Sequence, residues 1–267
     1  MAVDSDTIAF ANQLADASGK VIRPYFRKRI VVTDKGAIGP KPMFDPVTQA
    51  DKDAETAIRD LIHRERPDDG ILGEEHGHEA GTSGNTWILD PIDGTRAFIT
   101  GRPTWGTLIA LHDGTAPVLG IIDQPVLRER YIGYQGSAEV ITPDGREPLR
   151  TRPCARLCDA VVSTTHPWSY FDRAQRTAFA QVCEASRMSY FGGDCYAYAL
   201  LAMGFIDCII EGAMAPWDVA ALIPVIEGAG GVVTDWTGAP FAIGAQIIAS
   251  GDKRVHAQAI ALLKGAV

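Results

Sequence analysis

The sequence predicts a mixed α/β protein in which helices and sheets alternate in layers. Three observations support this prediction: helical apolar patterns lie near both ends, short apolar runs typical of strands lie between helical patterns, and no segment repeats. The 267 residues can bury one large core or two closely packed ones. A polar stretch at 143–156 indicates a boundary, so we expect residues 1–148 to form an N-terminal part and residues 149–267 a C-terminal part.

The N-terminal part is expected to start with two helices and to continue with strands. A helical apolar period predicts a helix over 5–28, with Pro24 as a kink, and a second helix over about 48–66. The Gly-, Pro- and Lys-rich segment 32–46 is predicted as an exposed loop. Apolar runs predict strands at 71–73, 87–90, 104–112, 117–123, 130–134 and 138–142.

The C-terminal part is expected to alternate strands and helices as far as the end of the chain. Strands are predicted at 159–165, 189–193, 207–211, 231–236 and 245–251. Helices are predicted at 169–185, at 195–204, at 216–231 and from Lys253 onward.

Charge and composition exclude several classes of partner. The net charge is −8 and no basic block is present, which argues against nucleic-acid binding and against a membrane-surface helix. No apolar run is long enough to span a membrane, and the first residues do not resemble a signal peptide. The five cysteines form no CxxC pair, so we expect reduced thiols in a cytoplasmic protein.

Acidic residues follow several of the predicted elements. Glu74 and Glu75 follow the strand ILG, Asp90 and Asp93 follow the strand WIL, and Asp218 lies in the first turn of a helix. Each acid alone also has a structural explanation, as a cap, a helix-dipole partner or a solvated charge. Carboxylates that converge repel one another and need a cation, and Mg²⁺ prefers such oxygen ligands. Together they therefore predict a magnesium site.

The stretch after the strand WIL adds an anion site to the predicted metal site. Pro91 stiffens the turn between the two aspartates, which leaves the Ile92 carbonyl available as another oxygen ligand. Gly94 permits close approach of a ligand, and the amides of Gly94 and Thr95 begin a helix, where an anion is favoured. Carboxylates beside such amides predict a site for a metal and a phosphate.

These motifs resemble the inositol monophosphatase superfamily of Mg²⁺-dependent phosphomonoesterases. The matching segments are GEE (73–75), WILDPIDGT (87–95) and PWDVAALIPVIEGAGG (216–231), preceded by Asp45 to Asp51, and the similarity covers nearly the whole chain. The resemblance implies an alternating αβαβα sandwich and hydrolysis of a small phosphomonoester by water, with two or three Mg²⁺ ions and no phosphoenzyme. It also implies a homodimer.

The resemblance assigns a role to each matching position. It implies the metal ligands Glu74, Asp90, the Ile92 carbonyl, Asp93 and Asp218, the phosphate-binding residues Gly94 and Thr95, the catalytic residues Asp51, Glu74 and Thr95, and the supporting acid Glu75. The spacing of Thr48 and Asp51 alone is close to a capping box, so the pattern leaves Asp51 open between capping and chemistry. The loop 35–44 corresponds to a mobile family segment and receives no individual role.

The substrate is expected to be L-histidinol phosphate. The stretch GGDCYAYALLAMG resembles the histidinol-phosphatase branch, in which Asp93, Gly193, Asp194 and Glu211 are the expected substrate-binding residues. Two carboxylates suit the cationic nitrogens of this alcohol. Asp194 has an alternative explanation as a helix cap.

Other residues near the motifs point less clearly to a substrate. Arg96 departs from the residues common in the inositol enzymes and weakly favours the histidinol branch. Trp105, Tyr196 and Trp217 are candidates for walls of the substrate pocket, or alternatively for core residues. His76 and His78 are expected to be solvated, because imidazole is a poor Mg²⁺ ligand.

Two other functions remain open from the sequence. One is an inositol monophosphatase or a broader phosphatase for sugar phosphates or bisphosphate nucleotides. The other is an inactive protein that senses metal or phosphate, against which the presence of both Asp51 and Thr95 argues.

Overall fold

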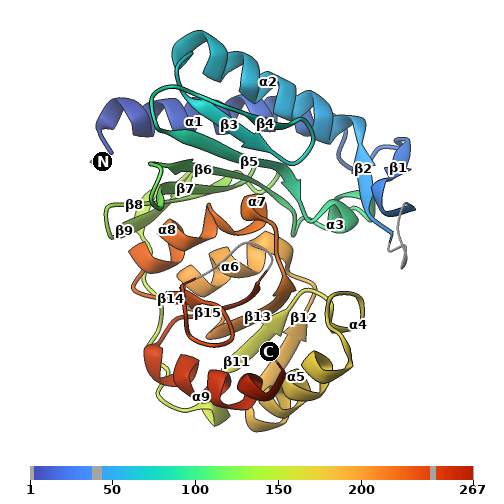
Figure 1. Ribbon diagram of the computed structural model, residues 1–267, viewed down its shortest axis with the longest axis vertical. Helices are drawn as coiled ribbons and strands as arrows, with labels where there is room; N and C mark the ends of the chain where they lie inside the picture. The colour runs from blue at the N-terminus through green and yellow to red at the C-terminus, as the bar shows by residue number, and fades with distance from the viewer. Residues whose placement is uncertain (1–2, 38–43, 241–244, 267) are drawn as a thin grey trace.

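The structure, a computed structural model, describes residues 3–37, 44–240 and 245–266 (Figure 1). Its α-helices are α1 (Ser5–Ile22), α2 (Gln49–Glu65), α3 (Thr95–Ile99), α4 (Pro167–Tyr170), α5 (Arg173–Ala185), α6 (Asp194–Ala202), α7 (Pro216–Val219), α8 (Leu222–Gly228) and α9 (Lys253–Leu263). None of these helices is both long and apolar enough to cross a membrane, as far as the chain is described.

Most strands belong to two sheets, one of eight strands and one of five. The larger sheet has the order β10-β9-β8-β7-β6-β5-β3-β4, with β3 (Gly70–Gly73), β4 (Gly77–Glu79), β5 (Thr86–Asp93), β6 (Gly106–His112), β7 (Pro117–Gln124), β8 (Glu129–Tyr134), β9 (Ser137–Thr142) and β10 (Gly145–Pro148). Its pairs are antiparallel except β3 with β5.

The smaller sheet has the order β12-β11-β13-β15-β14, with β11 (Val161–Thr164), β12 (Met188–Phe191), β13 (Cys208–Ala213), β14 (Val232–Thr234) and β15 (Gln246–Ser250). Its strand β11 runs parallel to both β12 and β13. The larger sheet is formed before residue 149 and the smaller one after it.

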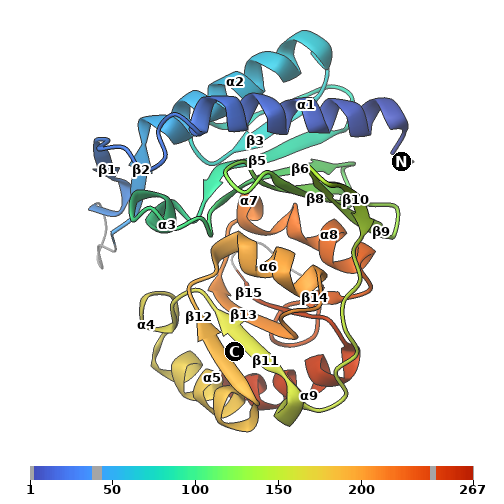
Figure 2. The ribbon, with the colours of Figure 1, turned by 180° about the vertical axis from the view of Figure 1, so that it is seen from behind.

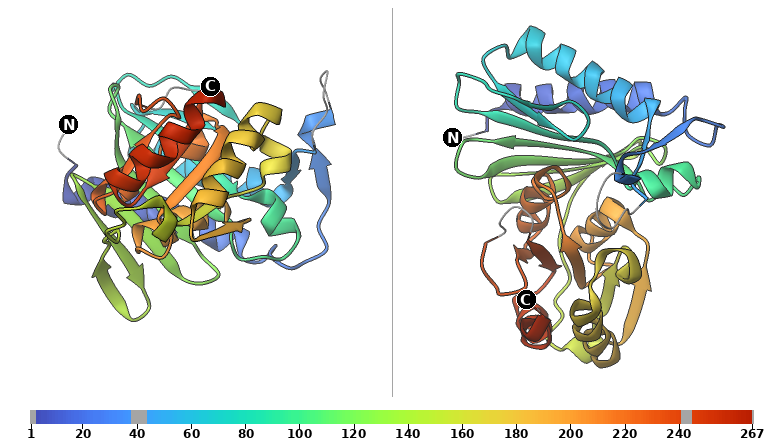
Figure 3. Two further views of the ribbon diagram at one scale, coloured as in Figure 1. Left: turned by 90° about the horizontal axis from the view of Figure 1, so that it is seen from below. Right: turned by 45° about the vertical axis from the view of Figure 1, so that its right-hand side comes forward.

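Helices and sheets alternate in five layers (Figures 1 and 2). Helices α1 and α2 cover one face of the larger sheet, and α6, α7 and α8 lie between the two sheets. Helices α5 and α9 cover the far face of the smaller sheet, as the right-hand view of Figure 3 also shows. This arrangement confirms the predicted αβαβα sandwich.

Two glycines allow α8 to lie directly on the larger sheet. A Cβ atom on Gly120 of β7 would lie 2.0 Å from the Ala221 carbonyl oxygen, and one on Gly133 of β8 would lie 2.2 Å from the Pro224 carbonyl oxygen. Any side chain at these positions would push the helix away from the sheet. The close contact sets the distance between the larger sheet and the middle helical layer.

Several predicted boundaries were wrong for identifiable reasons. The first helix ends at Ile22 rather than near residue 28, because Pro24 lacks the amide that would continue it. The predicted helix 216–231 breaks into α7 and α8, because Pro224 cannot donate the hydrogen bond that would join them.

The predicted helix 169–185 is also interrupted. The chain is extended at Phe171, and α5 starts anew with a capping box between Asp172 and Gln175. Strands β4 and β10 were not predicted; both are short and exposed, so they lack an apolar pattern.

The segment 32–46 is not simply the loop that was predicted. Its ends form a two-stranded sheet of β1 (Val32–Asp34) and β2 (Pro46–Thr48), which pair antiparallel. We call this two-stranded sheet the arm. A short 3₁₀ helix, Lys35–Ala37, follows β1, and residues 38–43 of the predicted loop 35–44 lie outside the described residues.

Candidate active site

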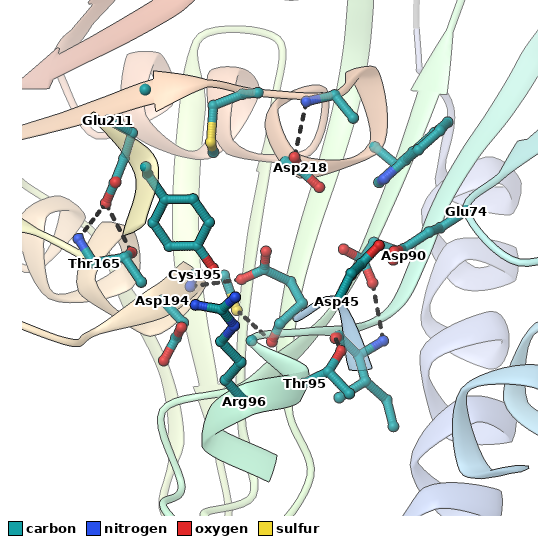
Figure 4. A pocket seen from close by; sticks show the side chains of 18 of the residues that line it. Asp45, Glu74, Asp90, Thr95, Arg96, Thr165, Asp194, Cys195, Glu211 and Asp218 are labelled. Carbon is teal, nitrogen blue, oxygen red and sulfur yellow. Dashed lines mark hydrogen bonds between the residues drawn. The ribbon is translucent and has the colours of Figure 1, made fainter. Parts of the chain in front are cut away.

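A cavity of about 360 Å³ lies between the larger sheet and the C-terminal part of the chain. Residues from β5, α3, α6, β13 and α7 line it, so both parts of the chain contribute to it. Its acidic lining residues are Asp45, Glu74, Asp90, Asp93, Asp194, Glu211 and Asp218. Figure 4 shows the carboxylates of Glu74, Asp90 and Asp218 pointing toward the same space, with Asp194 and Glu211 on the other side.

A bulge in β5 positions the two aspartates of the motif DPID. The strand does not end at Asp90, as predicted, but runs on to Asp93, and its pairing with β6 shifts between these two residues. The Ile92 amide donates a hydrogen bond to Asp90 Oδ1 at 3.0 Å, and Thr107 Oγ1 donates to the Pro91 carbonyl at 2.8 Å. The bulge therefore gives the side chains fixed directions at the edge of the cavity.

Asp90, Asp93 and Asp218 form a compact group, which we call the acidic trio. One carboxylate oxygen from each lies within 4.8 Å of the others. The Cys195 amide donates to Asp93 Oδ2 at 2.7 Å, and the Ala215 amide donates to Asp218 Oδ2 at 2.8 Å. Backbone amides at the starts of α6 and α7 thus orient the carboxylates from the C-terminal side.

Burial and nearby acidic charges raise the pKa of every member of the acidic trio. For Asp90, burial raises the pKa well above its usual value, and the charge of Glu74 adds to the effect. Burial and the charge of Asp218 likewise raise the pKa of Asp93. Burial raises the pKa of Asp218 to about 7. Like charges confined in a partly buried site produce such shifts, and a bound cation would offset them.

The acidic trio fits a hard divalent cation. Within the described residues, no ion pair joins a cationic side chain to any of its members. Their donors are carboxylate oxygens, which suit Mg²⁺ in number and type. The geometry thus supports a metal site at Asp90, Asp93 and Asp218.

Glu74 and Glu75 lie beside this group and share a lysine. Lys35 Nζ lies 2.7 Å from Glu74 Oε1 and 2.9 Å from Glu75 Oε1. The turn that carries both glutamates is held by buried Glu55, which accepts a hydrogen bond from the Glu75 amide at 2.8 Å. Lys35 received no role from the sequence, because nothing in the chain order places it beside these acids.

The spacing of Thr48 and Asp51 left open whether Asp51 caps a helix or faces the active site, and its carboxylate contacts residues of both kinds. Its Oδ2 atom accepts hydrogen bonds from the Thr48 amide at 2.9 Å and from Thr48 Oγ1 at 2.6 Å, which completes the capping box of α2. Its Oδ1 atom lies 3.5 Å from Thr95 Oγ1, which also donates to the Ile92 carbonyl at 3.0 Å. Burial raises the pKa of Asp51 to about 6.

Gly94 brings the predicted phosphate turn against the predicted substrate residue Asp194. Gly94 has a φ of +84°, and a Cβ atom there would lie 2.8 Å from Asp194 Cβ. Asp194 itself has a φ of +45°, unusual for a residue with a side chain, and its carboxylate accepts a hydrogen bond from Thr104 Oγ1 at 3.0 Å. It lies in the first turn of α6, but Gly193 and not Asp194 is the capping residue.

The other expected substrate residues lie close to Asp194. Glu211 lines the cavity, but its oxygens accept hydrogen bonds from the Thr165 amide at 2.7 Å, Thr165 Oγ1 at 2.8 Å and Thr164 Oγ1 at 3.1 Å (Figure 4). Burial raises the pKa of Glu211 to about 7. Gly193 does not line the cavity; a Cβ atom there would meet Ala197 Cβ at 2.6 Å.

Of the three aromatic residues considered as pocket walls, one lines the cavity and two do not. Trp217 lines the cavity. Trp105 is fully buried in the core against Phe26 and Phe98, and Tyr196 donates its hydroxyl to Glu129 instead of lining the cavity. The lining also includes Tyr170, which the sequence pattern placed inside a regular helix.

His76 and His78 are exposed and lie outside the cavity lining. Neither belongs to the acidic group that can hold a metal, as far as the described residues show.

The layered αβαβα fold and a cavity that gathers carboxylates beside a glycine turn fit the class of metal-dependent phosphatases. The chain belongs to the inositol monophosphatase family, whose sequence profile matches residues 4–267. It is 44% identical over 267 residues to the bifunctional phosphatase IMPL2, chloroplastic, of Arabidopsis thaliana, covering 96% of this chain and 74% of the relative.

Two further comparisons agree with this assignment. The chain is 35% identical to a histidinol-phosphatase of Chlorobaculum parvum, over 86% of each protein. Among solved structures, the inositol monophosphatase of Zymomonas mobilis superposes with a TM-score of 0.84 at 39% identity, covering 97% of this chain and 98% of that one.

Proposed function

We propose that the protein is a Mg²⁺-dependent phosphatase that hydrolyses L-histidinol phosphate to L-histidinol and phosphate. The observation that carries the choice of substrate is the presence of Asp194 and Glu211 in the same cavity as the acidic trio. Two carboxylates on the alcohol side favour an alcohol that carries cationic nitrogens. The similarity to a protein named histidinol-phosphatase supports the same choice.

The proposed reaction replaces the ester oxygen on phosphorus with a water oxygen. The P–O bond to histidinol breaks, and the proton lost by the water balances the one gained by the leaving alkoxide. Two or three Mg²⁺ ions, held by Glu74, the Ile92 carbonyl and the acidic trio, would neutralise the phosphate charge and acidify the attacking water.

The protein's own residues orient the reactants. The amides of Gly94 and Thr95 are proposed to bind the phosphate, and the Thr95 hydroxyl to hold the attacking water. Asp51 Oδ1 lies 3.5 Å from the Thr95 hydroxyl oxygen and can accept a proton from that hydroxyl, since burial raises the pKa of Asp51 toward neutrality. Glu75 shares Lys35 with Glu74 and thereby supports the orientation of Glu74.

Phosphate release from a panel of esters tests the proposal. The purified protein would be assayed with Mg²⁺ on histidinol phosphate, inositol 1-phosphate, a sugar phosphate and a 3′,5′-bisphosphate nucleotide. We expect the highest kcat/KM on histidinol phosphate. Faster turnover of inositol 1-phosphate would overturn the choice of substrate, and no turnover of any ester would overturn the proposed activity.

A broader phosphomonoesterase is the second candidate function. The Arabidopsis thaliana relative is described as bifunctional, and the Zymomonas mobilis structure is described as an inositol monophosphatase. Comparable kcat/KM values on histidinol phosphate and inositol 1-phosphate would favour this candidate.

A further inference from the structure

The short helix α4 is held firmly above the end of β13. A Cβ atom on Gly212 of β13 would lie 2.5 Å from the Tyr170 carbonyl oxygen, so only glycine permits this approach. The next residue, Phe171, is buried and packs against Phe179 and Trp236 with ring centroids 5.3 Å and 5.5 Å away. The backbone of Tyr170 is therefore fixed from both sides.

The side chain of Tyr170 lines the cavity on the side of the expected alcohol group. Thr165, which precedes α4, and Glu211, which precedes Gly212, line the same side and are hydrogen bonded to each other. Tyr170 is 36% exposed, and its partial burial raises the pKa of its phenol to about 12; the charge of Arg96 opposes this shift, whereas the charges of Asp194 and Glu211 add to it. The ring is thus a neutral surface beside two carboxylates.

Arg96 holds this ring in place from the opposite part of the chain. Its guanidinium carbon lies over the Tyr170 ring, 5.3 Å from the centroid, and it also donates a hydrogen bond to the Phe44 carbonyl. Among the described residues that line the cavity, Arg96 is the only cationic one. A cation–π contact of this kind restrains the ring from one face.

We propose that Tyr170 is a specificity-determining residue whose ring packs against the flat heteroaromatic ring of the substrate's alcohol group, while Asp194 and Glu211 face its cationic nitrogen. This inference rests on the proposed function and names the side of the pocket that recognises the imidazole. An inositol ring has no flat π-face, so it gains much less from such a contact.

The variant Tyr170→Ala tests the proposal through the split between KM and kcat. We expect KM for histidinol phosphate to rise about fivefold, the order of one lost aromatic contact, with kcat changed less than about twofold. KM for glycerol phosphate, an ester without an aromatic ring, should not change. Tyr170→Phe should resemble the wild type, because the ring and not the hydroxyl makes the contact.

Trp168→Ala is the matched control, since Trp168 lies on the same helix but is 67% exposed and does not line the cavity. It should leave both KM values unchanged. Isothermal titration with L-histidinol in the presence of phosphate gives a readout without turnover, and Tyr170→Ala should weaken this binding by the same factor.

The two proposals fail in different ways. If the wild type hydrolyses other esters but not histidinol phosphate, the proposed function is wrong. If the wild type hydrolyses histidinol phosphate but Tyr170→Ala raises KM equally for both esters, or for neither, the role of Tyr170 is wrong and the proposed function stands.

Discussion

Asp51 uses its two carboxylate oxygens for different purposes. One oxygen completes the capping box of α2 with Thr48, and the other faces the Thr95 hydroxyl. The helix cap thus aims the group that is proposed to accept a proton. The Asp51 side chain therefore serves both helix stability, through Thr48, and the proposed chemistry, through Thr95.

Substitution of each threonine should separate these two purposes. Thr95→Ala is expected to lower kcat at least about 100-fold with little change in stability, because it removes the hydroxyl that holds the water. Thr48→Ala is expected to cost about 1 kcal/mol of unfolding free energy and to leave most of kcat, because the Thr48 amide still orients Asp51. Steady-state kinetics and urea unfolding measure both effects. Equal losses of kcat in the two variants would contradict the division.

His256 provides a prediction about pH that is independent of the cavity. It is buried between Thr234 and Ser250, with ring nitrogens 2.9 Å and 3.0 Å from their hydroxyl oxygens, and burial lowers its pKa to about 4. The unfolded chain takes up this proton near the ordinary value of about 6.5, before the folded one does. The contribution of His256 to stability is therefore complete above pH 6.5 and is lost as pH falls toward 4.

The variant His256→Gln should show a smaller loss of stability over this pH range than the wild type. Urea unfolding at several pH values between 7 and 4 measures the difference, and titrations of other groups cancel in the comparison. A constant difference between the two proteins across that range would refute the assignment.

At this scale, residues that are neighbours in the chain could be predicted and those brought together by folding could not. The aspartates of DPID and the turn at Gly94 are visible in one short stretch. The contact of Lys35 with Glu74 joins residues 39 positions apart in the chain, and no local pattern reveals it. The same holds for Tyr170, whose role follows from the position of α4.

At the scale of elements, close contact between α8 and the larger sheet supports the position of α7, which carries the proposed metal ligand Asp218. Gly120→Ala is expected to cost at least about 2 kcal/mol, because the added methyl group would meet the Ala221 carbonyl oxygen at 2.0 Å and the backbone cannot easily yield. Urea unfolding measures this cost.

Gly265→Ala is the matched control, because a Cβ atom there would have no described neighbour within 4 Å. Its unfolding free energy should change by less than about 0.5 kcal/mol. Equal effects of the two substitutions would show that loss of glycine flexibility, and not helix–sheet contact, determines the cost.

The elements themselves were mostly predictable where they are long and buried. Strands β5 to β9 have clear apolar runs, and α2 has both a helical period and a capping box. The predicted helices ran too far at Pro24 and Pro224. The apolar period continues past each proline in the sequence, but the helical backbone does not, because proline has no amide hydrogen to donate. Short exposed strands such as β10 are formed by pairing with their neighbours, not by their own composition.

At the scale of the whole molecule, the proposed metal site joins the two parts of the chain. Asp90 and Asp93 come from β5 of the larger sheet, and Asp218 comes from α7 in the C-terminal part. Each part alone would lack a ligand. Without a cation the three carboxylates repel one another across the boundary between the parts.

Asp218→Asn should therefore stabilise the metal-free protein while weakening its response to Mg²⁺. At pH 8 and with EDTA, we expect unfolding free energy to rise by about 1 kcal/mol, since one buried charge is removed. Added Mg²⁺ should raise Tm in the wild type and much less in the variant, as measured by differential scanning fluorimetry.

Asp60→Asn serves as the control, because Asp60 is exposed on α2 and lies outside the cavity. It should retain the full response to Mg²⁺. A metal-free Asp218→Asn protein that is less stable than the wild type would show that the carboxylate is needed for packing. It would argue against destabilising repulsion among the three carboxylates.

The contact between Gly94 and Asp194 limits how this enzyme can diversify. The side chain at 194 meets no side chain at 94, so residue 194 can change among the few residue types that accept its φ of +45°. The reverse exchange is unfavourable, since a Cβ atom at 94 would lie 2.8 Å from Asp194 Cβ and the backbone there has a φ of +84°. With Asp194 in its proposed place beside the alcohol, new substrate preferences are therefore expected from single exchanges at 194, as long as Gly94, the proposed phosphate-binding residue, is inherited unchanged.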